Sequence, residues 1–459
     1  MKKNLFFVFY FLAFSAASFA SIRVTAKNCP GPNDLPKFLS KAAAEADKTL
    51  IIDGSDGIFK SEMLYFTGDE INIIGENNAV IDFSPTMFID ENLLAEIRKF
   101  MIENNKWMIK DYSSELDKKM ETSAGIYLFK AKKGSIKNLK VMKAQFAGIC
   151  LSLCENIVLE NIESCYNHYQ GFRLVGKIGS KKTVYTRNIR IRNCYSHGNY
   201  DDFTLGEEGD GFFIAQGAKD IILEDCVADC NSDDGFDTCN ALGNIVFKRC
   251  AARYNGFSEE MVLSGKADNI LTNSKCQRAN DKEKGALDLR CDGGGFGSPF
   301  WGTTFAPKVL SGQALIKPQD FLEPVSFYEC CAINNYGDGF SRRSAPNPVY
   351  IENSYSVGNG LNSYRLNCSK DVSAKFLNYG IKLENIVKNS FQRRSSFGND
   401  FDKGSGTAEI DDSKISIKTT NKTPEEIMKE LQISFPFKSA VNEYIAKRDC
   451  PGSMGQPLE

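Results

Sequence analysis

The sequence has almost no net charge and, beyond its first twenty residues, no long apolar run. Its 56 lysines and arginines nearly balance 58 aspartates and glutamates, which leaves a formal net charge of −2. Such a balance gives no overall attraction to nucleic acids or to anionic membrane surfaces. No segment after residue 20 offers the roughly 20 apolar residues that a membrane-spanning helix requires. We therefore predict no transmembrane segment and no nucleic-acid partner.

The apolar run that does exist lies at the beginning of the chain. Two lysines precede the stretch Leu5 to Phe14, and small residues occupy the −3 and −1 positions before Ser21. This order is typical of a cleaved secretory signal, which we place at residues 1–20. We expect the mature chain to start at Ser21 and to be exported, to the periplasm or the extracellular space.

The 459 residues are 42% hydrophobic and 25% charged, so the chain can bury a large core. Cysteine gives the first sign of a repeat. The count of 15 is odd, so at least one thiol has no disulfide partner within the chain. We interpret one series as core residues on successive repeats, and we regard Cys29 and Cys450, outside the repeats, as the cysteines that favour disulfide formation, with the pairing left open. The series is Cys194, Cys226, Cys250, Cys276 and Cys330.

Asparagine and glycine recur in the same frame. An asparagine follows each repeat mark by about five residues, and a glycine marks a second turn. Asparagine tolerates the left-handed backbone of turns, and its amide can bond to the next copy. Short strands that recur about every 24 residues bury an apolar core only when the copies stack. The pattern predicts an all-β fold, a right-handed parallel β-helix. The asparagines are Asn199, Asn231, Asn255, Asn280, Asn335 and Asn359, and the glycines are Gly211, Gly235, Gly285 and Gly339.

The rest of the chain is arranged around this β-helix, which we place at residues 21–418. Helix-forming sequence is expected at both ends and in one insertion, because the exposed strand edges of the terminal coils need covering. The expected segments are an N-terminal capping helix at 32–46, early coils at 49–83, a helical insertion at 85–122, coils at 123–291, a long loop at 292–322, and a C-terminal capping segment at 419–459 with a helix from Thr423 to Lys447.

Carboxylates concentrate in two copies of the repeat. The tripeptide Asp210-Gly211-Phe212 recurs one repeat later as Asp234-Gly235-Phe236, with Asp233 and Asp237 on either side. Four carboxylates this close repel one another unless a cation lies among them. A hard divalent ion with oxygen ligands fits, and Ca²⁺ suits an extracellular protein. The alternative is a set of solvated turn residues, since aspartate and glycine favour turns.

These residues resemble a known family. The run Gly209 to Phe212, followed one coil later by Asn231 to Asp237, is similar to the calcium-binding region of the polysaccharide lyase family 9 pectate lyases, over about residues 186–291. The resemblance implies β-elimination of a galacturonan, in which Ca²⁺ engages the uronate carboxylate and a basic residue removes the C5 proton. It also implies the calcium ligands Asp210, Asp233, Asp234 and Asp237.

The sequence departs from the family at the base. The family lysine lies one coil beyond the acidic residues, and in the aligned run 260–265 that position is Val262, which cannot accept a proton. Lys266 and Lys284 are the nearest replacements. A lysine base must be unprotonated at the working pH, so its pKa must be lowered by nearby positive charge or by burial. Two carboxylates in this region could add oxygen ligands or be exposed, namely Glu259 and Glu260.

Other side chains give weaker signals. Arg173 and Arg290 could pair with substrate carboxylates through bidentate hydrogen bonds. Trp301 could stack on a sugar, although packing of its own loop onto the coils is the simpler interpretation. His168 and His197 lie near predicted turns, and we interpret His197 as a turn residue.

Three functions fit this sequence. The first is a secreted, calcium-dependent lyase that cleaves a uronic-acid polymer such as pectate. The second is a polygalacturonase-like hydrolase, which needs two carboxylates around a water molecule; no basic substrate-clamp motif of that family is present. The third is a non-catalytic glycan-binding or adhesin-like β-helix that uses calcium for stability. The fold alone does not choose between them. In the first case we expect a monomer whose partner is an acidic polysaccharide.

Overall fold

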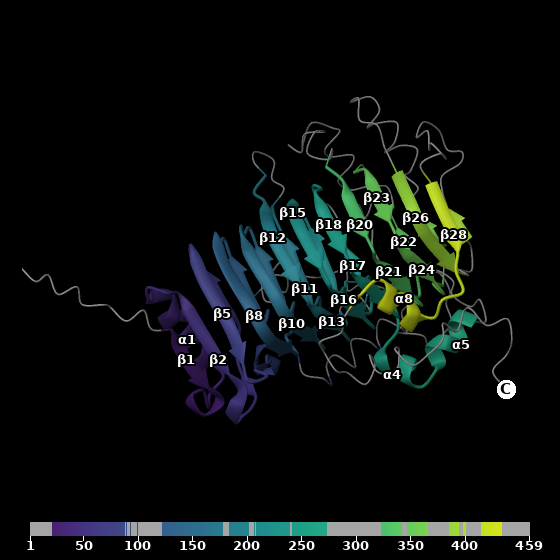
Figure 1. Ribbon diagram of the computed structural model, residues 1–459. Helices are drawn as coiled ribbons and strands as arrows, with labels where there is room; N and C mark the ends of the chain where they lie inside the picture. The colour runs from purple at the N-terminus through teal and green to yellow at the C-terminus, as the bar shows by residue number, and fades with distance from the viewer. Residues whose placement is uncertain are drawn as a thin grey trace, which may run out of the picture.

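The protein is an elongated stack of parallel β-strands, seen along its length in Figure 1. The structure is a computed structural model. It describes residues 21–87, 89, 92, 99, 122–177, 183–201, 206, 208–238, 241–272, 323–341, 347–360, 362–365, 385–393, 398–400 and 415–433. The expected signal at 1–20, most of the insertion at 85–122 and the loop at 292–322 lie outside these residues.

The chain winds so that its coils add strands to one long sheet, and most of the described coils also add a strand to a second face. The long sheet contains β1 (Ile22–Thr25), β2 (Thr49–Asp53), β3 (Phe59–Lys60), β5 (Glu70–Glu76), β6 (Val80–Asp82), β8 (Lys133–Met142), β10 (Ile157–Cys165), β12 (Thr186–Arg192), β13 (Tyr195–His197), β15 (Ala218–Glu224), β16 (Val227–Asp229), β18 (Ile245–Lys248), β19 (Ala251–Arg253), β20 (Val325–Tyr328), β21 (Cys331–Ile333), β23 (Val349–Glu352), β24 (Tyr355–Val357), β26 (Asn385–Arg393) and β28 (Ile415–Thr419).

Two shorter sheets form the second face. One contains β4 (Leu64–Thr67), β7 (Ile126–Phe129), β9 (Ile149–Ser152), β11 (Phe172–Val175), β14 (Phe212–Ala215) and β17 (Phe236–Asp237), and the other contains β22 (Phe340–Ser341), β25 (Asn362–Arg365) and β27 (Gly398–Asp400). The described helices are α1 (Asp34–Ala44), α4 (Glu259–Leu263), α5 (Lys266–Thr272) and α8 (Pro424–Glu430), with 3-10 turns at Ala26–Asn28, Gly54–Asp56 and Ser84–Thr86.

Strand register shows how the coils repeat. Ile221 pairs in parallel with Ile245, its equivalent one coil later. Other coils add residues at the turns without changing the strands, so the longer coil that follows Ile189 still brings it into parallel register with Ile221. Because the pairing is parallel throughout the described sheets, equivalent positions of successive coils lie above one another. The parallel β-helix expected from the sequence is therefore present.

Inward-facing side chains form columns along the axis of the stack. Phe172, Phe212 and Phe236 stack ring upon ring, with centroids 4.6 and 4.8 Å apart. Full burial of each such side chain contributes about 1.5 to 3 kcal/mol. The predicted cysteine column is present as well. Its described members, Cys194, Cys226, Cys250 and Cys330, are buried free thiols.

A second column consists of buried asparagines at one turn of the helix, and we call it the asparagine ladder. Each amide nitrogen donates to the side-chain oxygen of the next member, at 2.7 to 3.0 Å. Backbone N–H groups donate to the same oxygens. The amides thus satisfy one another without water, as predicted for stacked turns. The members are Asn167, Asn199, Asn231, Asn255, Asn335 and Asn359.

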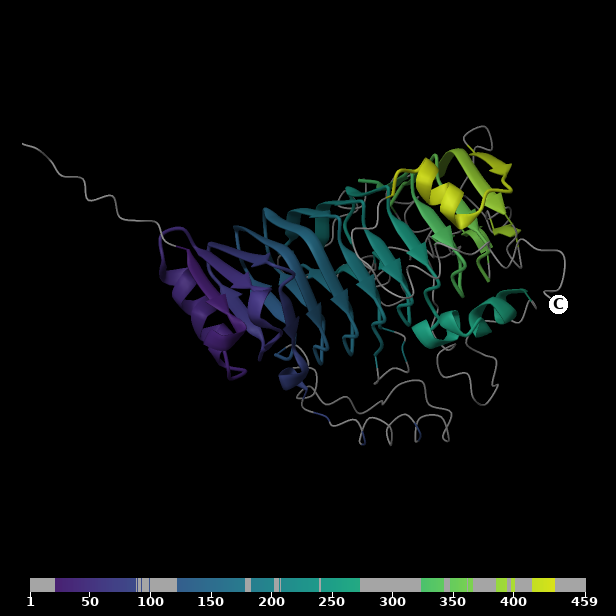
Figure 2. The ribbon, with the colours of Figure 1, turned by 60° about the horizontal axis from the view of Figure 1, so that its bottom comes forward.

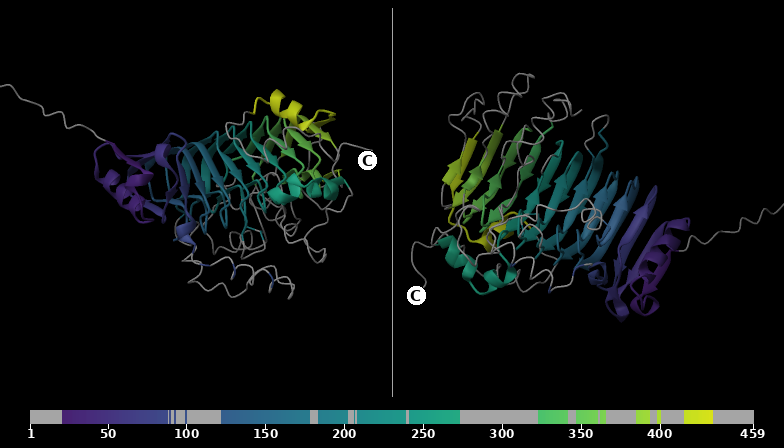
Figure 3. Two further views of the ribbon diagram at one scale, coloured as in Figure 1. Left: turned by 90° about the horizontal axis from the view of Figure 1, so that it is seen from below. Right: turned by 180° about the vertical axis from the view of Figure 1, so that it is seen from behind.

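The ladder also corrects one predicted coil. Asn255 bonds directly to Asn335, which lies 80 residues further along the chain. Asn255 and Asn335 are therefore adjacent rungs, with no coil between them. Cys276 and Asn280, which we had assigned to such a coil, lie outside the described residues. After β19 the chain leaves the stack and forms α4 and α5, which lie beside its C-terminal half in Figure 3. The repeat spacing had suggested a coil there because Cys276 follows Cys250 in the sequence at about the expected number of residues.

The helices at the two ends differ in position. α1 covers the N-terminal end of the stack, where Leu35, Leu39 and Ala42 are buried in the core (Figure 2). α8 packs instead on the side of the stack, because Ile427 and Met428 contact the outer faces of β21 and β24. The last described strand at that end is β28. Our expectation that the C-terminal helix caps the far end is therefore wrong for α8; residues 434–459 lie outside the described range.

Two further expectations concern cysteine and membranes. Cys29, which we regarded as a disulfide-forming cysteine, is a buried free thiol, and Cys450 lies outside the described residues. Among the described helices none combines the length and the apolar content needed to cross a membrane.

Candidate functional site

Four aspartates gather where the chain enters β14 and β17, and we call Asp210, Asp233, Asp234 and Asp237 the aspartate cluster. Phe212 pairs with Phe236, so the two tripeptides predicted to stack lie on adjacent coils. Oδ1 of Asp210 accepts a hydrogen bond of 3.2 Å from the backbone N–H of Asp234. Carboxylate oxygens of Asp210, Asp233 and Asp234 all lie within 4.8 Å of one another.

Glycine allows the backbones to approach this closely. A Cβ on Gly211 would lie 2.5 Å from the carbonyl oxygen of Gly235, which is well inside contact distance. Each residue of the stacked Asp-Gly-Phe tripeptides therefore has a structural role. Phenylalanine fills the core, glycine permits the contact between coils, and aspartate remains beside the carboxylates of the next coil.

The cluster is largely buried, and its carboxylates repel one another. Asp210 and Asp234 are 2% and 6% exposed, whereas Asp233 is half-buried. Burial raises the pKa of Asp210 well above its ordinary range, and the carboxylates of Asp237, Asp234 and Glu208 raise it further. A cation among these oxygens would reverse the effect, because it favours the ionised form of every carboxylate. The donor set, oxygen only and negatively charged, fits Ca²⁺.

Arg173 on β11 lies next to the cluster. Its Nη1 donates to Oε1 of Gln170 at 3.1 Å, and Nε2 of Gln170 donates to Oδ2 of Asp210 at 3.5 Å. The guanidinium also lies over the rings of Tyr169 and Phe213, at 5.8 and 4.9 Å from their centroids. The half-buried arginine is therefore held in place, one coil before Asp210. The arginine that the sequence offered as a carboxylate partner thus lies near the aspartates.

The residues that we considered for the catalytic base do not lie where we expected them. Val262 is fully buried in α4, where it packs with Phe257 and Met261, so the aligned run 260–265 is not a coil of the stack. The run that we aligned with the family lysine therefore lies in a helix beside the stack. Lys266 is exposed at the start of α5. Lys284 lies outside the described residues, in the segment that joins α5 to β20.

The weaker candidates for site residues lie in different parts of the structure. Glu260 is exposed on α4, and His168 is half-buried beside the ladder residue Asn167. Glu259 and His197 contact each other, which the sequence did not indicate. His197 is the last residue of β13 and is 1% exposed, so its assignment as a turn residue is wrong. Arg290 and Trp301 lie outside the described residues.

His197 belongs to a second group of ionisable side chains, which we call the histidine cluster: Glu163 and Cys165 on β10, His197 on β13 and Glu259 on α4. Its Nε2 lies 3.0 Å from Oε1 of Glu163, and its Nδ1 lies 2.6 Å from Oε1 of Glu259. Burial lowers the pKa of His197, but hydrogen bonds to Cys165, Glu163 and Glu259 outweigh it, so the pKa is well above the ordinary value.

Sequence reasoning missed this cluster because its members come from three elements. The alternation of side chains along β10 places Glu163 and Cys165 on one face, and that signal was available. The register that brings Cys165 beside His197 was hidden by an insertion that lengthens the coil between them. The contact from α4 could not be foreseen while residues 260–265 were assigned to a coil.

A family model and one solved structure agree with this architecture. The family model described as "Pel9A-like, right handed beta helix region" matches residues 66–270. The structure reported as "Crystal structure of pectate lyase Pel9A" is 17% identical, with a TM-score of 0.52 over 96% of this chain and 89% of that one. A second structure, "Geobacillus virus E2 - ORF18", is 10% identical, with a TM-score of 0.40 over 88% of this chain and 62% of that one. No curated protein matches the sequence. The chain has the pectate lyase-like, right-handed parallel β-helix fold.

Proposed function

We propose that the protein is a secreted, calcium-dependent polysaccharide lyase that cleaves a uronic-acid polymer by β-elimination. The observation that carries the proposal is the aspartate cluster, in which oxygens from two adjacent coils converge within 4.8 Å on a pectate lyase-like β-helix. Buried like charges repel one another, and a cation among these carboxylates would offset the repulsion. Asp210, Asp233, Asp234 and Asp237 would hold Ca²⁺.

The chemistry explains why a lyase needs such a site. Removal of the C5 proton places negative charge beside a carboxylate that is already charged, and a bound divalent cation offsets this charge. The chain itself must then supply three things, namely a fixed position for the uronate, a base near C5 and a path by which the 4-linked sugar leaves. The stacked coils provide a rigid scaffold for the first of these.

Arg173 is our candidate for fixing the uronate. The Gln170 hydrogen bond and the aromatic rings hold its guanidinium in one orientation, so little side-chain freedom is lost when a carboxylate binds. Replacement by lysine would keep the charge but lose the bidentate geometry. We expect Arg173→Lys to raise KM by about tenfold while kcat changes less, because positioning is lost and the reaction centre is intact.

Lys266 and Lys284 are our candidates for the base. The coil formed by β18 and β19 has no strand on the second face among the described residues, and Lys284 lies in the segment that follows. That coil is the one beyond the aspartate cluster, where the resemblance places the basic residue. Each lysine is tested by its alanine variant. A loss of about a thousandfold in kcat, roughly 4 kcal/mol in barrier height, would identify the base, and unchanged rates in both variants would place it elsewhere.

The decisive experiment follows ultraviolet absorbance while the mature protein is incubated with polygalacturonate, because elimination creates a double bond conjugated with the carboxylate. We expect a rise with calcium, none with chelator, and a loss of about a thousandfold or more in Asp234→Asn. The matched control is Asp220→Asn, an aspartate on the same coil that accepts a hydrogen bond from Asn244. It should retain full activity.

Other outcomes would select the other functions. New reducing ends without a rise in absorbance would indicate a hydrolase, which leaves saturated products. Calcium binding without cleavage of several uronans would contradict the lyase and indicate a glycan-binding β-helix that calcium stabilises. Retention of activity in Asp234→Asn and in chelator would remove calcium from the mechanism.

A further inference from the structure

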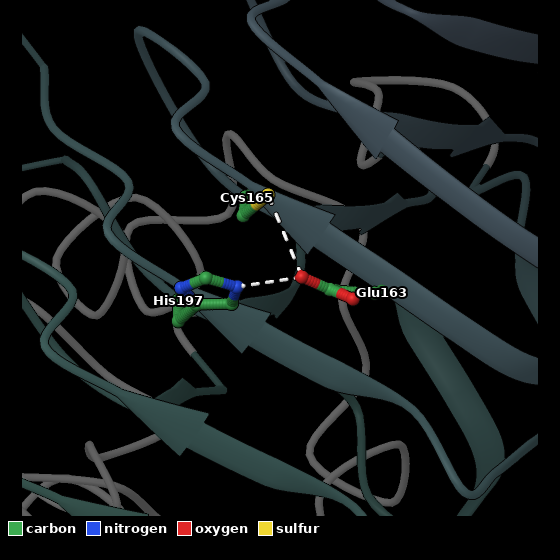
Figure 4. Close-up of side chains that lie close together, drawn as sticks. All are labelled: Glu163, Cys165 and His197. Atoms are coloured by element: carbon green, nitrogen blue, oxygen red, sulfur yellow. Dashed lines mark hydrogen bonds and ion pairs between the residues drawn. The ribbon is translucent and has the colours of Figure 1, made fainter. Parts of the chain in front are cut away.

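We propose that the histidine cluster is a zinc site, formed by Cys165, His197 and Glu163 and separate from the aspartate cluster. Figure 4 shows the three side chains turned toward one another from β10 and β13. Sγ of Cys165, Nε2 of His197 and a carboxylate oxygen of Glu163 lie within 4.8 Å of one another. The proposal does not depend on the proposed lyase activity.

The spacing of the three atoms fits a common ion. Tetrahedral zinc, with bonds of about 2.0 to 2.3 Å, places its ligand atoms roughly 3.3 to 3.6 Å apart. Here Nε2 of His197 lies 3.0 Å from Oε1 of Glu163, and Sγ of Cys165 lies 3.9 Å from the same oxygen. Shifts of less than an ångström would bring both distances to the tetrahedral values. Strand pairing of Cys165 with His197 holds the two residues side by side.

The other nitrogen of the ring has the partner typical of a metal-binding histidine. Nδ1 of His197 lies 2.6 Å from Oε1 of Glu259, and Oε2 of Glu259 accepts a hydrogen bond of 3.0 Å from the hydroxyl of Tyr166. A carboxylate on the far nitrogen orients the imidazole of zinc ligands and raises their basicity. His197 is also stacked on Tyr195, with centroids 4.4 Å apart, which further fixes the plane of the ring.

Charge and chemistry favour zinc over a second calcium. Thiolate and imidazole are ligands that zinc prefers, whereas calcium takes oxygen. A thiolate at Cys165 and the Glu163 carboxylate balance the two charges of the ion. Lys140, with Nζ at 2.7 Å from Glu163, and Glu259 balance each other. Lys140 donates to Oε1 of Glu163, the same oxygen that faces His197 and Cys165, so metal binding would require Lys140 to move to the other oxygen of this carboxylate. Protons on the thiol and on Nε2 would be displaced, as is general for zinc binding.

Two of the ligand side chains of the histidine cluster are buried, but a pocket lies on each of two sides of the cluster. Cys165 and His197 are at most 1% exposed, which excludes most water from the ligands. A pocket of about 260 Å³ lies on the side of Tyr166 and Glu259, and another of about 560 Å³ lies on the side of Lys140 and Glu163. An ion could therefore enter past partly exposed side chains. Three protein ligands leave one tetrahedral position for water.

The test is titration of the chelator-treated, calcium-saturated full chain with ZnCl₂ by calorimetry, and with Co²⁺ by absorbance. We expect one equivalent of zinc, and a cobalt spectrum with a thiolate charge-transfer band and the d–d bands of a tetrahedral ion. Cys165→Ala should abolish the thiolate band and weaken binding by more than a hundredfold. Glu259→Gln, which alters only the orienting partner, should weaken binding by about 10- to 100-fold.

Controls separate the site from other thiols and from misfolding. Cys29→Ala removes a different buried free thiol and should leave the band and the stoichiometry unchanged. Asp234→Asn should leave zinc binding unchanged. His197→Gln provides a second ligand variant if Cys165→Ala fails to fold, which circular dichroism would reveal. Zinc affinity equal to the parent's in whichever of the two ligand variants folds, or a cobalt spectrum without a thiolate band in the parent, would overturn the proposal. The cluster would then be an ion-paired contact between α4 and the β-helix.

Discussion

The asparagine ladder and the aspartate cluster lie on the same coils, and they differ in how buried polar groups are satisfied. Asn231 donates to Asn255 at 3.0 Å and accepts from Asn199 at 2.7 Å, so its amide needs nothing from outside the chain. Further along the same turn, Asp234 lies beside Asp210 and Asp233. An ionised carboxylate has acceptors only. The amides of the first column satisfy one another, whereas the carboxylates of the second repel one another.

The difference lies in the hydrogen-bond donors and acceptors that an amide and a carboxylate side chain carry. An amide has both, so a column of identical amides forms a continuous chain of hydrogen bonds. A column of identical carboxylates cannot do so and must bind protons or a cation. In a solenoid, where every repeated residue meets its own copy, stacked asparagine therefore indicates a structural column, and stacked aspartate indicates a ligand site.

The largest effect on stability is expected when the ladder is broken in its middle. Asn255→Ala would remove the acceptor of the Asn231 amide and backbone N–H, and the donor to Asn335. Each buried group left without a partner costs about 1 to 3 kcal/mol. We predict a loss of about 3 kcal/mol in the free energy of unfolding, measured by urea denaturation, with or without calcium.

The control for this prediction is an asparagine outside the ladder. Asn28 is exposed, and among the described residues its side chain accepts hydrogen bonds from Thr25 alone. Its replacement by alanine should cost less than about 1 kcal/mol. Equal losses in the two variants would show that stacking of the amides adds nothing to their burial.

Much of this comparison could be predicted from the sequence, because residues that repeat in a solenoid meet their own copies. The repeat spacing between the Asp-Gly-Phe tripeptides places Asp210 beside Asp234, and Asn231 followed by Asn255 indicates the ladder. The sequence could not place Val262 or the contact of Glu259 with His197. Both depend on α4, a short helix held by burial of Met261 and Val262 in a cluster with aromatic side chains, which is a matter of tertiary packing.

A smaller effect, opposite in sign, is expected when one aspartate is made to resemble the ladder. Asp210→Asn would remove one of the converging charges and give an amide that can donate to the carboxylate of Asp234 or Asp237. Without calcium we predict a gain of about 1 kcal/mol in the free energy of unfolding, comparable to one screened pair of like charges. With calcium the variant should gain less stability than the parent, because a ligand charge is lost. Thermal unfolding in chelator and in calcium would measure both, and a loss of stability in chelator would contradict the view that the carboxylates repel.

The smallest effect is the pH dependence of the calcium-free protein. Burial and the neighbouring carboxylates raise the pKa of Asp210 in the folded state, so the folded protein binds this proton more tightly than the unfolded chain does. Its contribution to stability is fully present below the unfolded pKa of about 4 and is lost as the pH rises through the folded pKa. In chelator the free energy of unfolding should therefore fall as the pH rises from about 4. Asp210→Asn should flatten that decline, whereas Asn255→Ala should shift the whole curve downward and leave its slope unchanged. Calcium should also remove the decline, because a bound cation favours the ionised carboxylate. A decline of equal slope in Asp210→Asn would show that the repulsion lies elsewhere and that the two columns do not differ in the way proposed here.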